Sequence, residues 1–306
     1  MKTVVFAYHN MGICGLKALE RNGFEIDAVF THDDDPGENC WFGSVKDWAH
    51  EKEIRVITNE RISEPIWVDT IALMKPQVIF SFYYRKMIPQ SILDIPPNGA
   101  FNLHGSLLPA YRGRCPANWV LVFGEKQTGV TLHYMVEKPD AGDIVGQKAV
   151  AIDFTDTAKT LYDKLCNASE LLLDETLPLI RSGRTPRRRQ NLSSGSYYGG
   201  RRPEDGRISW SLSADAVYNL VRAVTDPYPG AYALFDDDEK IIIWWALPLK
   251  EKTDKTPGSV TLSGQDVLVH TGKHAIKLLD VEINGRRFRG PAIIEYFKTR
   301  KVTRLK

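Results

Sequence analysis

The chain has 306 residues, of which 43% are hydrophobic and 25% are charged. These fractions are close to those of ordinary globular proteins, so they exclude a disordered chain, a collagen-like fibre and a coiled-coil rod. The formal net charge of +2 argues against a general nucleic-acid binder. A chain of this length holds one large domain or two unequal ones, and it buries enough surface to fold without disulfides or a structural metal.

The first half of the chain alternates strand-like and helix-like segments. Strands are predicted at residues 3–8, 26–31, 56–58, 77–82 and 100–103. Helical patterns separate most of them, around residues 16–20, at 45–53 and at 67–74. Apolar strands separated by helices are typical of a parallel sheet that is covered on both faces. We therefore expect a Rossmann-like α/β fold here.

A hairpin, a long helix and a linker are expected next. Residues 130–136 and 144–152 have the pattern of two strands joined by a turn at 138–142. Residues 157–182 form an amphipathic helical pattern that ends before Gly183. Residues 184–204 contain three consecutive arginines and several glycines and serines, which predicts a linker across the surface.

Beyond the linker the sequence predicts a smaller second domain. A strand is expected at 207–210 and a helix at 214–224, followed by short strands at 231–235, 240–245, 258–261, 267–270 and 275–281. Short strands at this spacing are typical of a small antiparallel barrel, here OB-like. We therefore divide the chain into a domain at 1–183, a linker at 184–204 and a barrel-like domain at 205–306.

The cysteines and apolar runs indicate a cytoplasmic protein without metal. The four cysteines include no C-x-x-C pair, which favours free thiols over a zinc or redox site. The N-terminus lacks the apolar stretch of a secretory signal, and no later segment has the roughly 18 apolar residues of a membrane helix. His270 and His274 fall in a strand–turn–strand region, so we expect no zinc there.

The first βα turn contains Gly12 and Gly15 but not the complete G-x-G-x-x-G of a dinucleotide site. The glycines are explained as well by a tight turn from strand to helix. Whether a ligand binds at the N-terminus of this helix, near His9, Met11 and Gly12, stays an open question.

Asn102 and His104 end a predicted strand at positions i and i+2, so their side chains lie on the same side. Open α/β sheets bind ligands at the carboxyl ends of their parallel strands. An amide can donate a hydrogen bond to a developing oxyanion while an imidazole moves a proton. Taken alone, the pair fits either an acyl-transfer site or a structural histidine.

The segment around this pair resembles the folate-dependent formyltransferase family. The family signature is Asn-x-His followed by Ser-Leu-Leu-Pro-x-Tyr-Arg-Gly, and Asn102, His104 and residues 106–113 match it without a gap. A later Asp-x-Gly-Asp-Ile loop matches residues 140–144, after Thr-Gly-Val-Thr at 128–131. The resemblance covers the first half well and the C-terminal domain only in general layout.

Within the family, the chain is most similar to sugar-nucleotide N-formyltransferases. Residues 4–9, 80–85, 101–105, 118–122 and 200–203 resemble the formyltransferase domain of bifunctional UDP-4-amino-4-deoxy-L-arabinose formyltransferases/UDP-glucuronate decarboxylases, which act in lipid A modification and polymyxin resistance. The resemblance implies 10-formyltetrahydrofolate as donor and a UDP-linked amino sugar as acceptor, with a dTDP-linked amino hexose as the alternative. A free-standing enzyme, a homo-oligomer and an excised domain of a decarboxylase fusion all stay open.

The resemblance also implies roles for individual residues. Asn102 and His104 would stabilise the oxyanion of a tetrahedral intermediate, and Asp140 would orient His104 and favour its charged form. The folate would contact Lys86, Met87, Ile88, Arg114, Val136, Glu137, Lys138, Pro139 and Asp140. The acceptor would contact His9, Met11, Gly12, Tyr111, Arg112, Asn118, Arg201 and Arg202.

Eight arginines and only two acids lie between Arg181 and Arg207. Arginine forks match phosphate oxygens with two parallel hydrogen bonds. A solvated basic surface explains residues 187–189. Arg201 and Arg202 follow two glycines, and we expect one of them to contact the pyrophosphate of a sugar nucleotide.

Three other functions stay open. A methionyl-tRNA formyltransferase shares the catalytic motif, but its basic insertion is replaced here by an acidic stretch at 33–38, which would repel phosphates. A formyltetrahydrofolate hydrolase carries an additional N-terminal domain, for which we expect no room before Met1. The non-enzyme alternative is a silent folate- or nucleotide-binding protein, which the presence of Asn102, His104 and Asp140 argues against.

Overall fold

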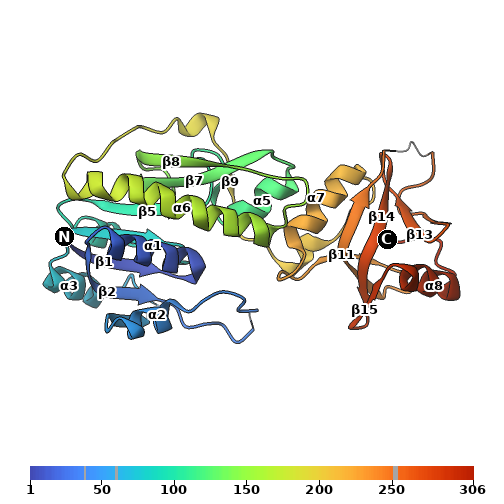
Figure 1. Ribbon diagram of the computed structural model, residues 1–306, viewed down its shortest axis with the longest axis horizontal. Helices are drawn as coiled ribbons and strands as arrows, with labels where there is room; N and C mark the ends of the chain where they lie inside the picture. The colour runs from blue at the N-terminus through green and yellow to red at the C-terminus, as the bar shows by residue number, and fades with distance from the viewer. Residues whose placement is uncertain (38, 59–60, 251–253) are drawn as a thin grey trace. The chain divides into compact units, whose positions relative to one another are not determined.

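The chain forms two compact units in a computed structural model that describes residues 1–37, 39–58, 61–250 and 254–306; Glu38 of the acidic stretch lies outside the described residues. The first unit comprises Met1–Pro116, Gln127–Ala151 and Tyr162–Gly199. The second comprises Ala117–Lys126, Ile152–Leu161 and Gly200–Lys306. Figure 1 shows both units and labels many of their elements. Among the described residues, no helix has the length and hydropathy needed to cross a membrane.

The first unit is built on a seven-stranded sheet with the strand order β3-β2-β1-β4-β5-β7-β8. Strands β1 to β5 pair in parallel, whereas β7 pairs antiparallel with both β5 and β8. The expected parallel sheet is therefore extended by the expected hairpin. The strands are β1 (Lys2–Ala7), β2 (Glu25–Thr31), β3 (Arg55–Thr58), β4 (Val78–Phe82), β5 (Ala100–His104), β7 (Gln127–Tyr134) and β8 (Ile144–Ala151).

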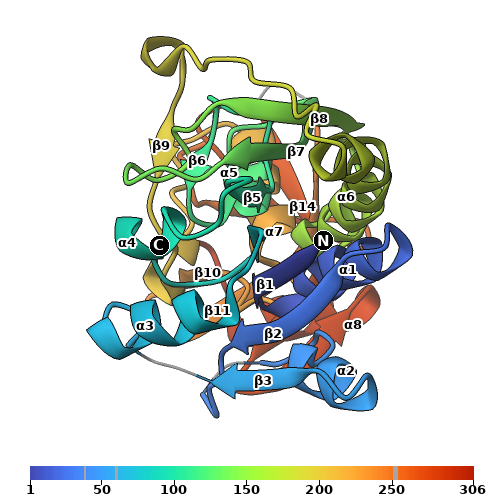
Figure 2. The ribbon, with the colours of Figure 1, turned by 90° about the vertical axis from the view of Figure 1, so that its left-hand side faces the viewer.

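Helices cover both faces of this sheet, which explains why its central strands are apolar without interruption. In Figure 2, α1 and α6 lie on one side of the sheet and α3 and α4 on the other. Phe6 and Phe30 stack at 4.8 Å in the core on the α3 side. On the α1 side, a Cβ at Gly15 would lie 2.3 Å from the Phe82 ring, so α1 packs closely on β4. The helices of the first unit are α1 (His9–Arg21), α2 (Val45–Glu51), α3 (Pro65–Met74), α4 (Gln90–Leu93) and α6 (Ala158–Arg181), of which residues 158–161 are counted with the second unit; α5 (Pro116–Val122) belongs to the second unit except for Pro116.

Residues 184–199 of the predicted linker are hydrogen-bonded into the first unit. Arg188 and Ile144 form an isolated bridge. After a short 3₁₀ turn, η1 (Leu192–Ser194), strand β9 (Tyr197–Tyr198) pairs in parallel with β6 (Arg112–Gly113). This pairing places the segment against the loop that follows β5.

The second unit contains an antiparallel sheet with the order β10-β11-β14-β13-β12, and β15 also pairs with β14. The predicted helix at 214–224 is confirmed, and its Ser213 N-cap accepts a hydrogen bond from the Ala216 amide. The predicted strand at 207–210 is wrong: Arg207 forms only an isolated bridge with Tyr232, because the chain turns at residues 209–212. The elements are η2 (Pro203–Gly206), α7 (Ala214–Val224), β10 (Ala231–Leu234), β11 (Lys240–Pro248), β12 (Val260–Ser263), β13 (Asp266–His270), β14 (Ala275–Ile283), β15 (Arg286–Arg289) and α8 (Pro291–Arg300).

Candidate active site

Four polar side chains meet at the carboxyl end of β5. His104 Nδ1 and His133 Nε2 each lie 3.6 Å from the same oxygen, Oδ1 of Asp140. The Asn102 amide nitrogen lies 3.1 Å from His133 Nε2. The three residues expected from the sequence therefore come together, and they are joined by a second imidazole.

His133 is the member of this cluster that the sequence analysis did not assign. In the β5–β7 ladder it stands directly opposite Asn102, and it is 1% exposed. Its Nδ1 lies 2.8 Å from the Tyr134 carbonyl, which can only accept, so Nδ1 carries the proton. Nε2 is then free to accept a hydrogen bond from Asn102. Only the antiparallel register of β5 and β7 shows this pairing, and no local motif marks it.

The loop that presents Asp140 is fixed by backbone constraints. A Cβ at Gly142 would lie 1.9 Å from the Tyr134 carbonyl oxygen, so the loop requires glycine there. The Gln190 side-chain amide donates to the carbonyls of Asp140 at 3.0 Å and Gly142 at 2.6 Å. Gln190 belongs to the predicted linker, which therefore helps to hold the Asp140 loop.

The Asp140 carboxylate stays ionised. Burial by itself would raise the pKa of this carboxyl, but the His104 and His133 side chains and the Gly113 N–H together hold that pKa well below its usual range. The Gly113 amide donates to Oδ2 at 2.8 Å, while Oδ1 faces the two imidazoles. The site therefore holds one fixed negative charge beside two imidazoles.

His104 is held by the loop that follows it. Its Nε2 lies 2.8 Å from the Tyr111 carbonyl, so Nε2 donates and Nδ1 faces Asp140. Tyr111 adopts a φ of 57°, and its amide donates to Ser196 Oγ at 2.8 Å. The separation of 3.6 Å between His104 Nδ1 and Asp140 is longer than a hydrogen bond, as is common for catalytic pairs without ligand.

The residues expected to contact the folate differ in exposure. Met87 and Val136 are exposed apolar side chains, whereas Ile88 is buried in the core with α3 and α4. Arg114 is exposed, and its backbone amide donates to the Tyr198 carbonyl. The remaining members, which are Lys86, Glu137, Lys138 and Pro139, are exposed or half-buried.

Three residues expected to contact the acceptor surround the N-terminus of α1. Tyr162 donates its hydroxyl to His9 Nδ1 at 2.6 Å and accepts from the Met11 amide at 2.8 Å. The His9 ring stacks on Phe42 at 3.8 Å. A Cβ at Gly12 would lie 3.0 Å from Val45, so helix packing alone accounts for this glycine.

The other expected acceptor residues lie in both units. Tyr111 and Arg112 belong to the first unit, and Tyr111 stacks on Tyr198 at 5.3 Å. In the second unit, Asn118 donates its amide to the Ala223 carbonyl at 2.8 Å and is 6% exposed. Arg201 stacks on Trp119 at 4.6 Å and donates to the Asp205 carbonyl. The Arg202 backbone amide donates to the Asp205 carboxylate at 2.7 Å.

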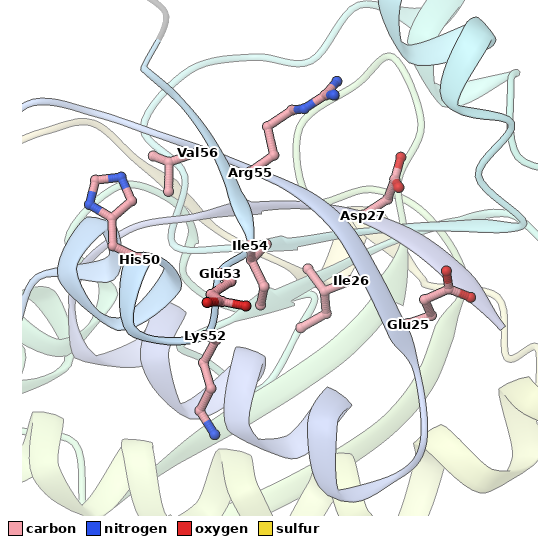
Figure 3. A pocket seen from close by; sticks show the side chains of 9 residues that line it. All are labelled: Glu25, Ile26, Asp27, His50, Lys52, Glu53, Ile54, Arg55 and Val56. Atoms are coloured by element: carbon pink, nitrogen blue, oxygen red, sulfur yellow. The ribbon is translucent and has the colours of Figure 1, made fainter.

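A hollow on the first unit lies away from these residues. It has a volume of about 960 Å³ and is lined by residues 25–27, 50 and 52–56 (Figure 3). These residues come from the starts of β2 and β3 and from the end of α2, whereas Asn102 and His104 lie at the carboxyl end of β5. The hollow therefore has no part in the chemistry described above.

Family models match both halves of the chain. The formyl transferase model matches residues 1–177, and the model of the formyl transferase C-terminal domain matches residues 201–294. The chain belongs to the formyl transferase family. This formyltransferase is thus an enzyme whose family chemistry fits the cluster at the end of β5.

Solved structures share its fold. An N-formyltransferase from Helicobacter canadensis in complex with folinic acid and dTDP-3-aminofucose is 22% identical, with a TM-score of 0.69 over 91% of this chain and 98% of that one. WlaRD, a sugar 3N-formyltransferase solved with dTDP and 5-N-formyl-THF, is 20% identical, with a TM-score of 0.69 and coverages of 91% and 97%. HypX from Aquifex aeolicus is 18% identical with a TM-score of 0.64, and the match covers 99% of this chain but 48% of HypX.

Proposed function

We propose that this formyltransferase moves the formyl group of 10-formyltetrahydrofolate to the amine of a nucleotide-linked amino sugar. The observation that carries the proposal is the cluster of Asn102, His104, His133 and Asp140. It combines an amide donor, two imidazoles and a fixed carboxylate at the ligand-binding end of the sheet.

The reaction joins the sugar nitrogen to the formyl carbon and breaks the bond between that carbon and N10 of the folate. The neutral amine attacks, and the carbonyl oxygen becomes an oxyanion. Asn102 has two amide hydrogens; His133 accepts one, which leaves the other to donate to the oxyanion. Because one amide hydrogen remains available, Asn102 can stabilise the oxyanion.

The proton balance uses His104 and Asp140. The attacking nitrogen loses one proton and the departing N10 gains one, so the site must accept and return a proton. The ionised Asp140 stabilises a positive charge on His104. On substrate binding, His104 Nε2 would exchange the Tyr111 carbonyl for the oxyanion, and it would then give its proton to N10 as the bond to the formyl carbon breaks. The proton that the attacking nitrogen loses would pass to His104 and restore its charge.

The proposed donor site uses the exposed apolar side chains of Met87 and Val136, which offer a surface for a folate ring. The other proposed donor contacts are Lys86, Ile88, Arg114, Glu137, Lys138, Pro139 and Asp140. Two features of the chain fit a folate donor. They are the exposed side chains of Met87 and Val136 and the polar cluster at the carboxyl end of β5.

For the acceptor, we propose UDP-4-amino-4-deoxy-L-arabinose, and with it a role in lipid A modification and polymyxin resistance. This acceptor is supported by residues 80–85 and 118–122, which resemble the formyltransferase domain of the bifunctional UDP-4-amino-4-deoxy-L-arabinose enzymes. A dTDP-linked amino hexose is the second candidate, since two structures of the same fold were solved with dTDP-3-aminofucose or dTDP. The proposed acceptor contacts are His9, Met11, Gly12, Tyr111, Arg112, Asn118, Arg201 and Arg202.

A panel of UDP- and dTDP-linked amino sugars, each incubated with 10-formyltetrahydrofolate, tests this proposal. We expect one sugar to give a formamide product that mass spectrometry detects, together with one equivalent of tetrahydrofolate. Folate binding without transfer to any sugar would instead favour a silent binding protein, and formylation of methionyl-tRNA would favour the tRNA enzyme.

A further inference from the structure

Arg112 lies between the two backbone groups that hold the catalytic side chains. The carbonyl of Tyr111, one residue before it, accepts from His104 Nε2 at 2.8 Å. The amide of Gly113, one residue after it, donates to Asp140 Oδ2 at 2.8 Å. The position of Arg112 is therefore tied on both sides to the transfer site.

The Arg112 side chain is mostly buried, and its guanidinium has no hydrogen-bond partner among the described residues. Arg112 is 8% exposed, and its Nε is enclosed without a hydrogen-bond partner. Within the described parts of the chain, its side chain makes neither a hydrogen bond nor an ion pair. A buried guanidinium normally finds acceptors for its donors, because burying an unpaired charge is costly.

Arg222 shows how a buried arginine in this chain is ordinarily satisfied. It is 2% exposed and donates to Asn219 Oδ1 at 2.9 Å. It also donates to the carbonyls of Asp153 at 3.1 Å and Asp156 at 3.3 Å. Arg112 has no such acceptors among the described residues, so burial alone does not explain its state.

The backbone around Arg112 is fixed. The Arg112 amide donates to the Ser196 carbonyl at 3.0 Å, and the Arg114 amide donates to the Tyr198 carbonyl at 2.9 Å. Gly113 has a φ of 96°, and a Cβ there would lie 2.2 Å from the Tyr198 carbonyl oxygen. Substrate binding would therefore meet an arginine whose backbone is already ordered, which reduces the cost of ordering it.

We propose that Arg112 is an anion-binding residue of the transfer site and that a substrate oxyanion is its missing partner. The inference rests on the proposed function and deepens it. Both substrates carry such a group about one ring away from the reacting nitrogen: the phosphate beyond the sugar ring of the acceptor, and the glutamyl carboxylate beyond the aminobenzoyl ring of the folate. The planar fork of arginine matches either pair of oxygens with two parallel hydrogen bonds.

Binding titrations without turnover test the inference and separate the two sources. The variant is Arg112→Met, which keeps an apolar stem but removes the charge, and its matched control is Arg55→Met, at an exposed arginine of the remote hollow in Figure 3. The probes are UDP, dTDP and 5-formyltetrahydrofolate. We expect Arg112→Met to weaken either the nucleotides or the folate by about 10-fold or more, while Arg55→Met changes neither.

The probe whose binding weakens shows which substrate supplies the oxyanion that Arg112 binds. Weaker UDP or dTDP binding with unchanged uridine or thymidine binding assigns the phosphate, and weaker folate binding alone assigns the carboxylate. Changes below about 2-fold for every probe, or equal losses in Arg55→Met, would overturn the proposal. These results do not depend on amino-sugar turnover, so they can stand even if the proposed reaction fails.

Thermal unfolding distinguishes anion binding by Arg112 from a purely structural role of this residue. Because Arg112→Met removes an enclosed Nε–H that has no acceptor, we expect its melting temperature to equal or exceed that of the wild type. Arg112→Lys keeps the charge without the fork and should give an intermediate affinity for the same probe. A lower melting temperature for Arg112→Met together with wild-type affinity in Arg112→Lys would overturn the proposal.

Discussion

The Asn102 amide nitrogen and His133 Nε2 form a 3.1 Å hydrogen bond straight across the ladder between β5 and β7. The Tyr134 carbonyl accepts from His133 Nδ1, which leaves Nε2 as the acceptor. Because Nε2 accepts from the Asn102 amide nitrogen, it fixes which way the Asn102 amide is turned. An amide turned by 180° would present its oxygen instead of its N–H to an oxyanion. We therefore assign His133 the role of orienting Asn102.

Replacing His133 by Phe should lower kcat by about 10-fold or more, because the Asn102 amide loses the acceptor that orients it. The KM for the folate should change little. Steady-state kinetics in both the wild-type and the Asn102→Ala backgrounds measure the coupling between the two residues. Most of the effect of His133→Phe should disappear in the Asn102→Ala background, and the part that remains measures the contact of His133 with Asp140.

Two further variants sharpen this prediction. His133→Gln, which supplies another side-chain acceptor, should recover part of the rate. His50→Phe, at an exposed histidine of α2, should leave kcat unchanged. Equal losses from His133→Phe in both backgrounds would mean that His133 does not act through Asn102.

Replacing Asp140 by Asn should lower kcat by about 10²-fold or more while the fold survives. The amide oxygen of Asn can still accept from the Gly113 N–H, but it offers no negative charge to His104. Kinetics paired with circular dichroism make the comparison. A variant with nearly normal kcat would remove Asp140 from the mechanism.

The Gln190→Ala variant should lose activity because two hydrogen bonds to the catalytic loop disappear. Each such bond contributes roughly 1 kcal/mol, so we expect a melting temperature several degrees lower as well as a lower kcat. Gln127→Ala, at an exposed glutamine of β7, is the matched control. If both variants behave alike, residues 184–199 do not support the site.

Stability should fall between pH 6.5 and pH 4 because of His32. Burial, helped by Lys86 and Arg85, lowers the pKa of His32 from 6.5 to about 4. In this window the unfolded chain binds a proton that the folded chain does not, so the folded state loses stability as the pH falls. His32 is half-buried, and solvent screening limits the loss to roughly 1–2 kcal/mol.

The pH dependence of unfolding in His32→Gln checks this origin. Gln keeps an acceptor for the Arg85 amide, which donates to His32 Nε2 at 3.1 Å, but it does not titrate. Denaturant titrations from pH 7 to pH 4 should therefore show a smaller loss for the variant. The same slope in both proteins would show that other groups govern it.

The sequence predicts the parts of this enzyme that depend on local pattern. Apolar strands separated by helical periods give the sheet of the first unit, and the helical pattern at 214–224 gives α7. The catalytic motif gives Asn102, His104 and Asp140. In contrast, β15 and α8 were not predicted; Arg286–Arg289 is mostly charged and mostly exposed, and it forms a strand through its pairing with β14.

The unassigned parts of the site depend on tertiary contacts. His133 becomes recognisable only through the register of β7 against β5. Residues 184–199 have the composition of a linker, yet Gln190, Ser196 and Tyr198 bind loops that lie far away in the sequence. Composition cannot show such contacts, because backbone groups of distant loops make them.

Transfer of a labelled formyl group is the most direct test of the central claim. The enzyme would be mixed with 10-formyltetrahydrofolate carrying ¹³C in the formyl group and with UDP-4-amino-4-deoxy-L-arabinose or a dTDP-linked amino hexose, and NMR would follow the label. We expect the label to appear as a formamide on the sugar nitrogen, about 10²-fold or more slowly in Asn102→Ala and His104→Ala. Label released as formate at the same rate with and without sugar, or full transfer by His104→Ala, would contradict the mechanism.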